Sequence, residues 1–319
     1  LSNDMDTSYY TKLALDQSSP FFNKATQQTT APGSTLKLLS TVTGMMEGLI
    51  DDGTYIECTG EFDLVTPSIW CWNKQGHGSL EIRGAIEQSC NYFFNMIGFQ
   101  AGKNSNGDFS ENLSLEKLQK YASEFHLDQK TGIEISEATP HVSDSKAVPS
   151  YIGQGNHLFT TSQLARYATA LATSGTVYDL SLLNKVTDSQ GKTLKEYDPA
   201  IENTMSDVPD NVWEDIHDGM RRVVETHEQF KGLGVTLSGK TGTAELDIYH
   251  PNHGLFIGYT TDENSQPEYA IAVRIANGYS SGNACLTAND ILKYIYNLAD
   301  EDTILTGYAS SDTSNTSND

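Results

Sequence analysis

The clearest shortage in this sequence is of positive charge. Its 319 residues include 20 Lys and Arg against 42 Asp and Glu, which gives a formal net charge of −22 at pH 7. A surface of this sign repels phosphate backbones and anionic lipid headgroups. We therefore expect neither nucleic acid nor an anionic membrane surface as a partner.

Long apolar segments and a secretion signal are lacking as well. No run of eighteen apolar residues occurs, so no transmembrane helix is predicted. The first residues, Leu1–Asp6, have neither the basic nor the apolar region of a signal peptide. We expect a soluble chain of one large or two closely joined domains. Because it does not begin with Met, we also expect it to be a piece of a longer protein.

The stretch that organises the chain is a turn followed by a helix. Pro32 and Gly33 break regular structure, and apolar residues then recur at positions 36, 39, 42, 46 and 49. This spacing predicts an amphipathic helix that opens at Ser34 and runs to Ile50. Lys37 follows Ser34 by three residues, so its amine is expected one turn away on the same face, close enough to take the hydroxyl proton. The pair is a candidate nucleophile with its own base.

The S-x-x-K pattern is not specific by itself, because Ser at the start of a helix is most often only an N-cap. The pattern also occurs at Ser114/Lys117, Ser143/Lys146 and Ser189/Lys192. Of these, Ser114 is expected to cap a helix over residues 115–125, and Ser189 is expected to lie in a turn.

Two further short motifs support the reading of Ser34. Ser89-Cys90-Asn91 offers a hydroxyl and a carboxamide that point to the same side if the loop is extended, with Cys90 on the other side. Lys240-Thr241-Gly242-Thr243 offers a cation, two hydroxyls and a glycine that lets a substrate approach. Similar triplets recur at Ser110, Ser281 and Lys130, so neither motif is specific alone.

The pattern of elements predicts an α+β fold with an antiparallel sheet. Helices are expected over residues 79–88, 92–99, 161–173, 212–225 and 289–299. Strands are expected over residues 235–238, 255–259 and 269–275, and residues 54–78 and 128–160 are expected to be loops. Residues 301–319 are rich in Ser, Thr, Asp and Asn and are expected to form a disordered tail.

The three motifs in this order resemble the transpeptidase domain of a class B penicillin-binding protein, one of the serine penicillin-recognising enzymes. The likeness covers nearly the whole chain. It extends to residues 22–27, His77-Gly78, residues 131–133, residues 152–155 and residues 239–245.

The resemblance implies a transpeptidase domain over residues 1–300. This domain would have a β-lactamase-like antiparallel sheet flanked by helices, and a helical subdomain inserted at roughly residues 45–170. The first strands of the family's sheet are missing from this sequence, as are the membrane anchor and pedestal domain that precede them in the family. The parent protein would then be anchored at the extracytoplasmic face of a bacterial cell membrane, with partners in cell-wall synthesis.

The resemblance also implies a reaction. Ser34 attacks the carbonyl between the two terminal D-alanines of a peptidoglycan stem peptide, and β-lactams acylate the same residue. Lys37 must be uncharged to act as the base, which a second cation at Lys240 and partial burial would favour. Ser89 relays a proton. The implied substrate-binding residues are Asn91, Thr241, Gly242 and Thr243, and no cofactor is needed for catalysis.

Three other functions are weighed against this one. Gly234–Thr241 matches the phosphate-binding pattern G-x-x-x-x-G-K-[ST], but its interior alternates like a strand and no helical pattern follows it. A β-lactam sensor or serine β-lactamase on the same fold is the main alternative. A degenerate wall-binding scaffold is disfavoured by three intact motifs.

The four cysteines are too few for a disulfide scaffold, but three of them fall within 33 residues. Cys58, Cys71, His77 and Cys90 form the ligand set of a structural zinc site, although their spacing is longer than in zinc fingers. A disulfide between Cys58 and Cys71 is the alternative. The sequence leaves both open.

Overall fold

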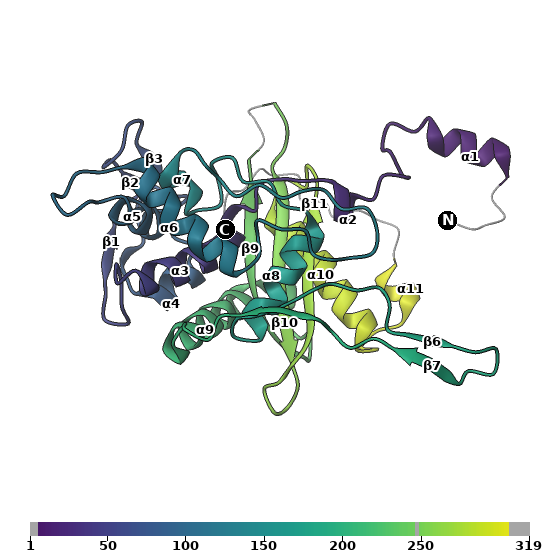
Figure 1. The fold of residues 1–319 in the computed structure, drawn as a ribbon. Coiled ribbons are helices and arrows are strands. Elements are labelled where there is room, and N and C mark those ends of the chain that lie inside the picture. Colours follow the sequence, from purple (N-terminus) through teal and green to yellow (C-terminus); the bar gives the residue numbers. More distant parts are fainter. Residues whose placement is uncertain (1–5, 246–248, 306–319) are drawn as a thin grey trace.

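The computed structural model describes residues 6–245 and 249–305. A three-stranded antiparallel sheet stands at its centre, and a helix-rich region with four short strands lies beside it, on the left of Figure 1. The helices are α1 Thr7–Ala14, α2 Lys24–Gln27, α3 Lys37–Met46, α4 Ile82–Glu87, α5 Asn91–Ala101, α6 Glu111–Glu124, α7 Ala147–Ser150, α8 Thr161–Ala172, α9 Asp210–Thr226, α10 Ser281–Ile295 and α11 Glu301–Ile304, with 3₁₀ helices η1 Gly33–Leu36 and η2 Glu228–Phe230. The strands are β1 Ile56–Cys58, β2 Glu61–Phe62, β3 Ile69–Trp70, β4 Gly78–Leu80, β5 Thr176–Tyr178, β6 Lys185–Thr187, β7 Thr193–Glu196, β8 Ile201–Thr204, β9 Thr236–Ala244, β10 His253–Thr261 and β11 Pro267–Ile275.

The central sheet has the order β11-β10-β9 and is covered on both faces. Successive side chains of β10 point to opposite sides, as the pleat requires. Leu255 and Ile257 belong to the larger core with α8, whereas Phe256 belongs to a smaller core with Ala284 and Leu292 of α10. The sheet is therefore buried between helices, and this explains why its strands read as nearly continuous apolar runs.

Most predicted elements exist, but several boundaries were wrong. The expected strands are each present as nine-residue strands, and the closing helix runs over Ser281–Ile295 instead of 289–299. The helix expected over 79–88 begins only at Ile82, because β4 precedes it and Glu81 caps it. The two expected loops also hold regular structure: four short strands in 54–80, and α7 in 128–160.

The expectation that Ser114 caps a helix is wrong. The helix α6 begins four residues earlier, and its N-cap is Ser110, whose Oγ accepts from the N–H of Leu113 at 3.4 Å. Ser114 lies inside the helix, fully buried, and donates to the carbonyl of Gly98 at 2.8 Å. The Nζ of Lys117, in the same motif, lies 3.8 Å from a carboxylate oxygen of Glu47.

The strand β11 is an edge of the sheet, and within the described ranges no further strand pairs with it. Its first four residues are exposed. At its other end Arg274 donates to the carbonyl of Lys24, at 3.1 Å, and to Oε1 of Gln28, at 2.8 Å. The segment around α2 thus lies beside one end of this edge and leaves the rest uncovered.

The C-terminal segment belongs only in part to the described residues. Glu301–Ile304 form α11, within the segment where the composition predicts a disordered tail, and residues 306–319 lie outside the described residues. Of the helices formed by the described residues, none is both long and apolar enough to cross a membrane.

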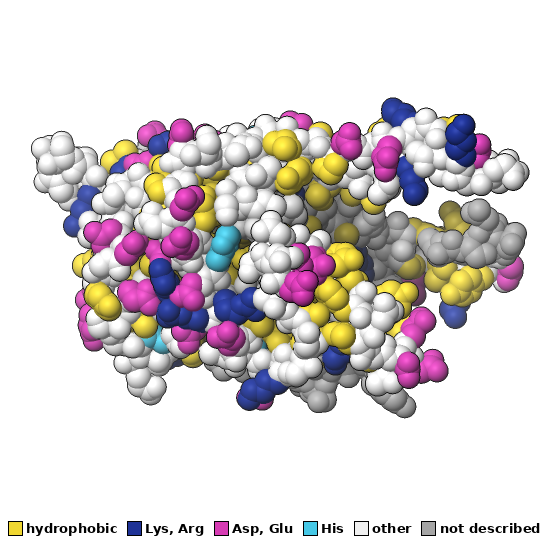
Figure 2. All heavy atoms as spheres, turned by 90° about the horizontal axis from the view of Figure 1, so that it is seen from below, with side chains coloured by type: hydrophobic (Ala, Val, Ile, Leu, Met, Phe, Trp, Pro, Cys, Tyr) yellow, Lys and Arg dark blue, Asp and Glu magenta, His cyan; other side chains and the backbone are white. Residues whose placement is uncertain are grey.

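The surface agrees with the shortage of positive charge. On the face shown in Figure 2, basic side chains lie singly or in small groups among acidic ones, and the described residues there form no continuous basic patch. Arg83 of α4 contacts Asp215 of α9 at 2.5 Å, and within α9 Arg222 contacts Asp218 at 2.7 Å. These arginines are thus engaged with carboxylates of the same chain.

Candidate active site

Ser34 lies in the 3₁₀ turn η1, and the α-helix begins at Lys37. The prediction of an α-helix opening at Ser34 and ending at Ile50 is therefore wrong at both ends, since α3 stops at Met46. In a 3₁₀ turn residues i and i+3 are eclipsed, and the backbone N–H of Lys37 donates to the carbonyl of Ser34. The nucleophile and its expected base are thus stacked along one side of the turn.

Lys37 is fully buried, and its amine contacts the Ser89-Cys90-Asn91 motif. Its Nζ donates to the carbonyl oxygen of Ser89 at 2.7 Å, to Ser89 Oγ at 3.0 Å and to Asn91 Oδ1 at 2.7 Å. It also lies 5.7 Å from the centre of the Phe94 ring. The first two motifs therefore meet, although more than fifty residues separate them in the chain.

Lys240 brings the third motif to the same point. It is fully buried on β9, and its Nζ donates to Ser89 Oγ at 2.8 Å and to the carbonyl oxygen of Thr241 at 3.2 Å. Ser89 Oγ thus lies between two lysine amines. Burial in a medium of low dielectric strengthens such contacts, because water cannot screen them.

The same strand excludes a phosphate-binding loop. In such a loop a helix begins at the Gly-Lys-Ser/Thr end. Here β9 continues unbroken through Ala244 and pairs with β10, with Lys240 opposite Ile257. The rejection of the match at residues 234–241 is confirmed.

The loop that carries Ser89 is not extended as predicted. Ser89 has a φ of +46°, in the left-handed region, because the chain must reverse between α4 and α5 within a few residues. The expected division of side chains still holds. Ser89 and Asn91 contact Lys37, whereas Cys90 Sγ lies 4.0 Å from Cys71 Sγ on the other side.

Ser34 opens into a small cavity of about 50 Å³. Thr243 reaches it from β9, and the buried Oγ1 of Thr243 has no partner among the described residues. Thr241 is almost fully buried. The residues that line the cavity are Ser34, Trp72, Asn91, Ile152, Gln154, Thr243 and Glu245.

Gly242 has a packing role that the sequence did not predict. A Cβ on Gly242 would lie 2.8 Å from Thr35 Cγ2 and 3.1 Å from the carbonyl oxygen of Pro32. Its missing side chain therefore lets β9 pack against the turn that carries Ser34. Gly33 acts in the same way from the turn, since its Cβ would lie 2.4 Å from the carbonyl oxygen of Thr243.

For four of the residues that line the cavity at Ser34, the sequence predicted no role. Ile152, Gln154 and Glu245 lie in stretches that resemble the family, so this resemblance could have pointed to them as site residues. Trp72 lies in a segment read as loop, and its Nε1 donates to the carbonyl oxygen of Gln88 at 2.9 Å. Nothing in the local pattern marks this contact, because it depends on how the segment folds back.

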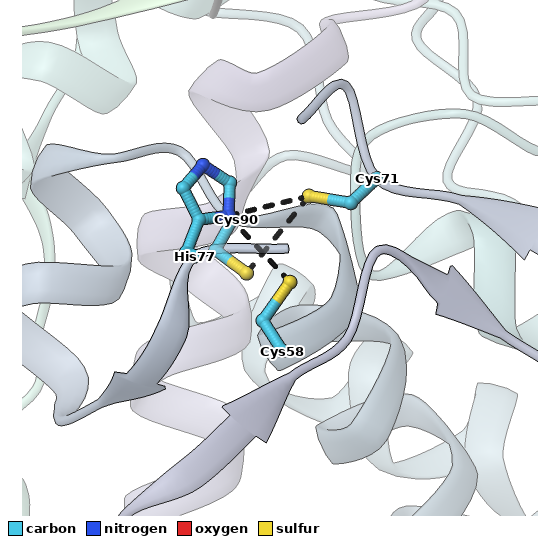
Figure 3. A group of neighbouring side chains, drawn as sticks. All are labelled: Cys58, Cys71, His77 and Cys90. Carbon is cyan, nitrogen blue, oxygen red and sulfur yellow. Dashed lines mark hydrogen bonds between the residues drawn. The ribbon is translucent and has the colours of Figure 1, made fainter. Parts of the chain in front are cut away.

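The three clustered cysteines and His77 converge behind the Ser89 loop (Figure 3). His77 Nδ1 lies 3.5 Å from Cys58 Sγ and 3.6 Å from Cys71 Sγ, and all four ligand atoms lie within 4.8 Å of one another. The thiols are free, so the predicted alternative of a disulfide between Cys58 and Cys71 is wrong.

The cluster fits a tetrahedral zinc ion. With Zn–S near 2.3 Å and Zn–N near 2.0 Å, a tetrahedron places two sulfurs roughly 3.8 Å apart and a sulfur and a nitrogen roughly 3.5 Å apart. The observed separations of 4.0, 3.5 and 3.6 Å are close to these values. The hydrogen bond with Cys90 holds the pKa of the Cys71 thiol well below its usual range, which favours the thiolate that a metal requires.

Solved structures identify the class of fold. The chain is similar to penicillin-binding protein 2 in its complex with MreC from Helicobacter pylori, with a TM-score of 0.74 and 21% identity over 92% of this chain and 55% of that chain. It is also similar to penicillin-binding protein A from M. tuberculosis in an imipenem acyl-enzyme complex, with a TM-score of 0.75 and 19% identity over 92% and 65% of the two chains. The fold is that of penicillin-binding transpeptidases, and the predicted α+β class is confirmed.

The family follows from the sequence as a whole. The model of the penicillin binding protein transpeptidase domain matches residues 2–297, and this chain belongs to that family. It is 25% identical to the peptidoglycan D,D-transpeptidase MrdA of Acinetobacter baumannii, over 89% of this chain and 45% of that protein. For the protein of the same name from Haemophilus influenzae the values are 26%, 90% and 48%. The resemblance inferred from the motifs is confirmed, and the chain spans about half the length of the curated relatives it matches.

Proposed function

We propose that this chain is the catalytic domain of a peptidoglycan D,D-transpeptidase that cross-links stem peptides through an acyl-enzyme on Ser34. The observation that carries the proposal is Ser89 Oγ held between Lys37 Nζ and Lys240 Nζ, at 3.0 and 2.8 Å, beside a serine that opens into a cavity. Residues 1–300 form the domain, with a helical subdomain inserted at roughly residues 45–170.

The first half of the reaction forms an ester. Lys37 first loses to solvent one of the three protons that it shares with Ser89 and Asn91, and the neutral amine then takes the proton of Ser34 Oγ as this oxygen attacks the carbonyl carbon between the two terminal D-alanines. The C–N bond then breaks. The leaving nitrogen takes a proton that passes from Lys37 through Ser89 Oγ, and D-alanine departs.

The second half reverses these roles. The amine of a neighbouring stem peptide loses its proton through the same Ser89 and Lys37 path and attacks the ester carbonyl. The new amide forms as the C–O bond to Ser34 breaks, and Ser34 regains its proton. No metal or cofactor takes part in either half.

Binding of the peptide is divided between two elements. Asn91 Oδ1 is occupied by Lys37, so its Nδ2 is the group that donates to a peptide carbonyl. Lys240, Thr241 and Thr243 receive the terminal carboxylate, and Gly242 lets the strand lie close to the nucleophile. Backbone N–H groups of Ser34 and Thr243 form the oxyanion hole, where one donor is typically worth about 10²- to 10³-fold in rate.

The thiol cluster takes a structural zinc ion. Cys58, Cys71, His77 and Cys90 would hold it, and the ion would supply fixed geometry and no chemistry at Ser34. Cys90 lies between Ser89 and Asn91 in the chain, so a ligand at its sulfur holds the loop that positions both. The metal site braces the second motif from behind.

We propose a setting that the relatives support. The parent protein is anchored at the extracytoplasmic face of a bacterial membrane and works with cell-wall synthesis partners, as the Helicobacter pylori penicillin-binding protein 2 is found in complex with MreC. Stem peptides and β-lactams are its ligands.

A serine β-lactamase is the second candidate, because Glu245 lines the same cavity as Ser34. A carboxylate there could activate water against the ester. Labelling with a fluorescent penicillin tests both functions. A label that persists for hours and is absent from Ser34→Ala supports the transpeptidase. Fast loss of label that slows in Glu245→Gln identifies a hydrolase, and equal labelling of wild type and Ser34→Ala rules out both.

A matched control is available for this experiment. Ser189 belongs to another S-x-x-K pattern and lies exposed near the β6–β7 turn. Ser189→Ala should be labelled like the wild type.

A further inference from the structure

A second cavity lies away from the active site, between β1 and α5. It measures about 430 Å³ and shares no lining residue with the cavity at Ser34. β1 stands at the outer edge of the helix-rich region (Figure 1), and Tyr55 and Glu57 beside the cavity are exposed, so the cavity opens to solvent. We call it the β1–α5 groove. Its lining residues are Leu49, Ile50, Thr54, Tyr55, Ile56, Glu57, Tyr92, Met96, Ile97 and Gln100.

One wall of the groove is a strand with an unpaired edge. β1 forms a two-stranded antiparallel sheet with β4, and no residue of β4 lines the groove. The groove therefore lies on the other side of β1, where no strand formed by the described residues pairs with it. Such an edge presents backbone N–H and C=O groups in the spacing that a further strand requires.

The opposite wall is a row of side chains along α5. Tyr92, Met96 and Gln100 are four residues apart and so lie on one face of the helix. At 1.5 Å per residue the row is about 12 Å long, the length of roughly four residues of a strand. In the part of the chain that the structure describes, the amide of Gln100 has one hydrogen-bond partner, the sulfur of Met96 at 3.7 Å. A thioether is a weak acceptor, so a ligand carbonyl can replace it.

The two faces of β1 differ in chemistry, because successive side chains of a strand point to opposite sides. Ile56 packs against the larger core, whereas Glu57 is exposed, and within residues 6–245 and 249–305 its carboxylate makes neither a hydrogen bond nor an ion pair. Asp51 and Asp52, in the turn before β1, are exposed as well, and the described residues that line the groove include no Lys or Arg. A ligand complementary to both faces has an apolar side and a cation.

We propose that the β1–α5 groove binds an extended segment of a partner protein, which adds as a strand to the unpaired edge of β1. In this mode of recognition, main-chain hydrogen bonds give affinity and pockets for alternate side chains give specificity. The segment carries apolar side chains on the face that packs against Tyr92 and Met96. On its other face it carries a Lys or Arg, which pairs with Glu57 across the two strands. The proposal does not depend on the chemistry at Ser34.

The test uses fluorescein-labelled pentapeptides of the form X-Lys-X-Lys-X, with Val, Leu, Ile, Phe or Tyr at each X. In an extended peptide of this form the apolar side chains lie on one face and the lysines on the other. Binding to the full chain is measured by fluorescence polarisation. The variants are Tyr55→Ala and Glu57→Gln, with Tyr294→Ala and Glu263→Gln as matched controls. Tyr294 on α10 is 60% exposed, against 66% for Tyr55, and Glu263 is exposed in the β10–β11 turn.

At least one peptide should bind saturably to the wild type. Tyr55→Ala should weaken the tightest peptide about tenfold, because a Tyr that packs on a ligand contributes strongly to affinity. Glu57→Gln should weaken it about two- to fivefold, the effect of one exposed charge pair, and should have no effect when norleucine replaces both lysines. The two controls should bind like the wild type. All four variants should keep the thermal unfolding of the wild type, since the four side chains are exposed.

Methylation of the peptide nitrogens tests the addition of a strand. Alternate N–H groups of a strand point to opposite sides, so methylation of one alternate set should weaken binding about tenfold or more, and methylation of the other set should have little effect. Three results would overturn the proposal. They are the absence of saturable binding by any peptide up to about 1 mM, binding that neither Tyr55→Ala nor Glu57→Gln changes, and equal effects of the two methylation patterns.

Discussion

The backbone N–H of Gly33 donates to the carbonyl oxygen of Gly153 at 3.1 Å, and a Cβ on Gly153 would lie only 1.8 Å from the carbonyl oxygen of Gly33. Both residues have positive φ, +54° and +74°. The turn that carries Ser34 therefore rests directly on the backbone of the segment after α7, with no side chain between them.

This contact predicts a strong effect of Gly153→Ala. The new methyl group must push the nucleophile turn aside, and a displacement near 1 Å can cost about 100-fold in rate. We expect penicillin acylation of Ser34 to slow by roughly that factor. Gly191→Ala is the matched control, because Gly191 has a φ of +81° with nothing within 4 Å of its Cβ position. It adds backbone strain without a clash, and equal slowing in both variants would contradict the prediction.

Removal of the Ser89 hydroxyl should break the contact that joins the three motifs and slow the reaction. Ser89→Ala leaves Lys37 and Lys240 without the oxygen that both amines contact, so the proton path is cut. We expect penicillin acylation to fall by about 10²- to 10⁴-fold, the usual size of a general acid–base contribution. In a double-mutant cycle with Lys240→Ala the losses should not add, because the two groups share one contact.

Ser110→Ala is the control for that variant. Ser110 belongs to a second S-x-N triplet but caps α6, so its loss should cost about 1 kcal/mol of stability and leave acylation intact. Acylation of Ser89→Ala at the wild-type rate would refute the relay.

Metal analysis tests the thiol cluster. We expect purified protein to hold about one zinc per chain by atomic emission. Zinc at 100 times its dissociation constant should stabilise the fold by about 3 kcal/mol, seen as a higher melting temperature that chelation reverses. Chelation should also slow acylation of Ser34, since it frees the Ser89 loop. Cys71→Ser should lose the metal and Cys285→Ser should keep it, because Cys285 lies in the separate core of α10. A metal-free wild type with full stability would rule out the site.

The buried His157 side chain should make the free energy of unfolding depend on pH. Burial lowers its pKa to about 4, and its ring stays neutral because Nδ1 accepts from the N–H of Ser143 at 3.0 Å while Nε2 lies 3.2 Å from the carbonyl oxygen of Ser150. The unfolded chain, with a pKa near 6.5, binds the proton more readily. The contribution of His157 is therefore complete above about pH 6.5 and is lost as the pH falls towards 4, by about 3 kcal/mol in all.

Urea unfolding at pH 7.5 and pH 4.5 measures this loss. Three other histidines with lowered pKa values, the half-buried His217 and His227 and the buried His253, act in the same direction, so the His157 share is read as a difference from His157→Gln. The variant should lose less stability between the two pH values than the wild type. An identical loss would show that His157 does not contribute.

The sequence by itself determined the family and the candidate catalytic residues of this protein. Ser34, Lys37, Ser89 and Lys240 were chosen from short motifs, and the α+β class followed from apolar periods of 3.6 and 2, because these local patterns are set by side chains that are neighbours along the chain.

Local structure was less well determined where a tertiary contact competes. Ser110 caps α6 instead of Ser114, since Ser114 is needed against Gly98 in the core, and the turn at Ser34 is a 3₁₀ turn because it packs against β9 and Gly153. The disulfide between Cys58 and Cys71 was excluded only by the tertiary structure. Whether Cys58, Cys71, His77 and Cys90 converge depends on how β1, β3, β4 and α5 pack, and spacing along the chain carries no information about that.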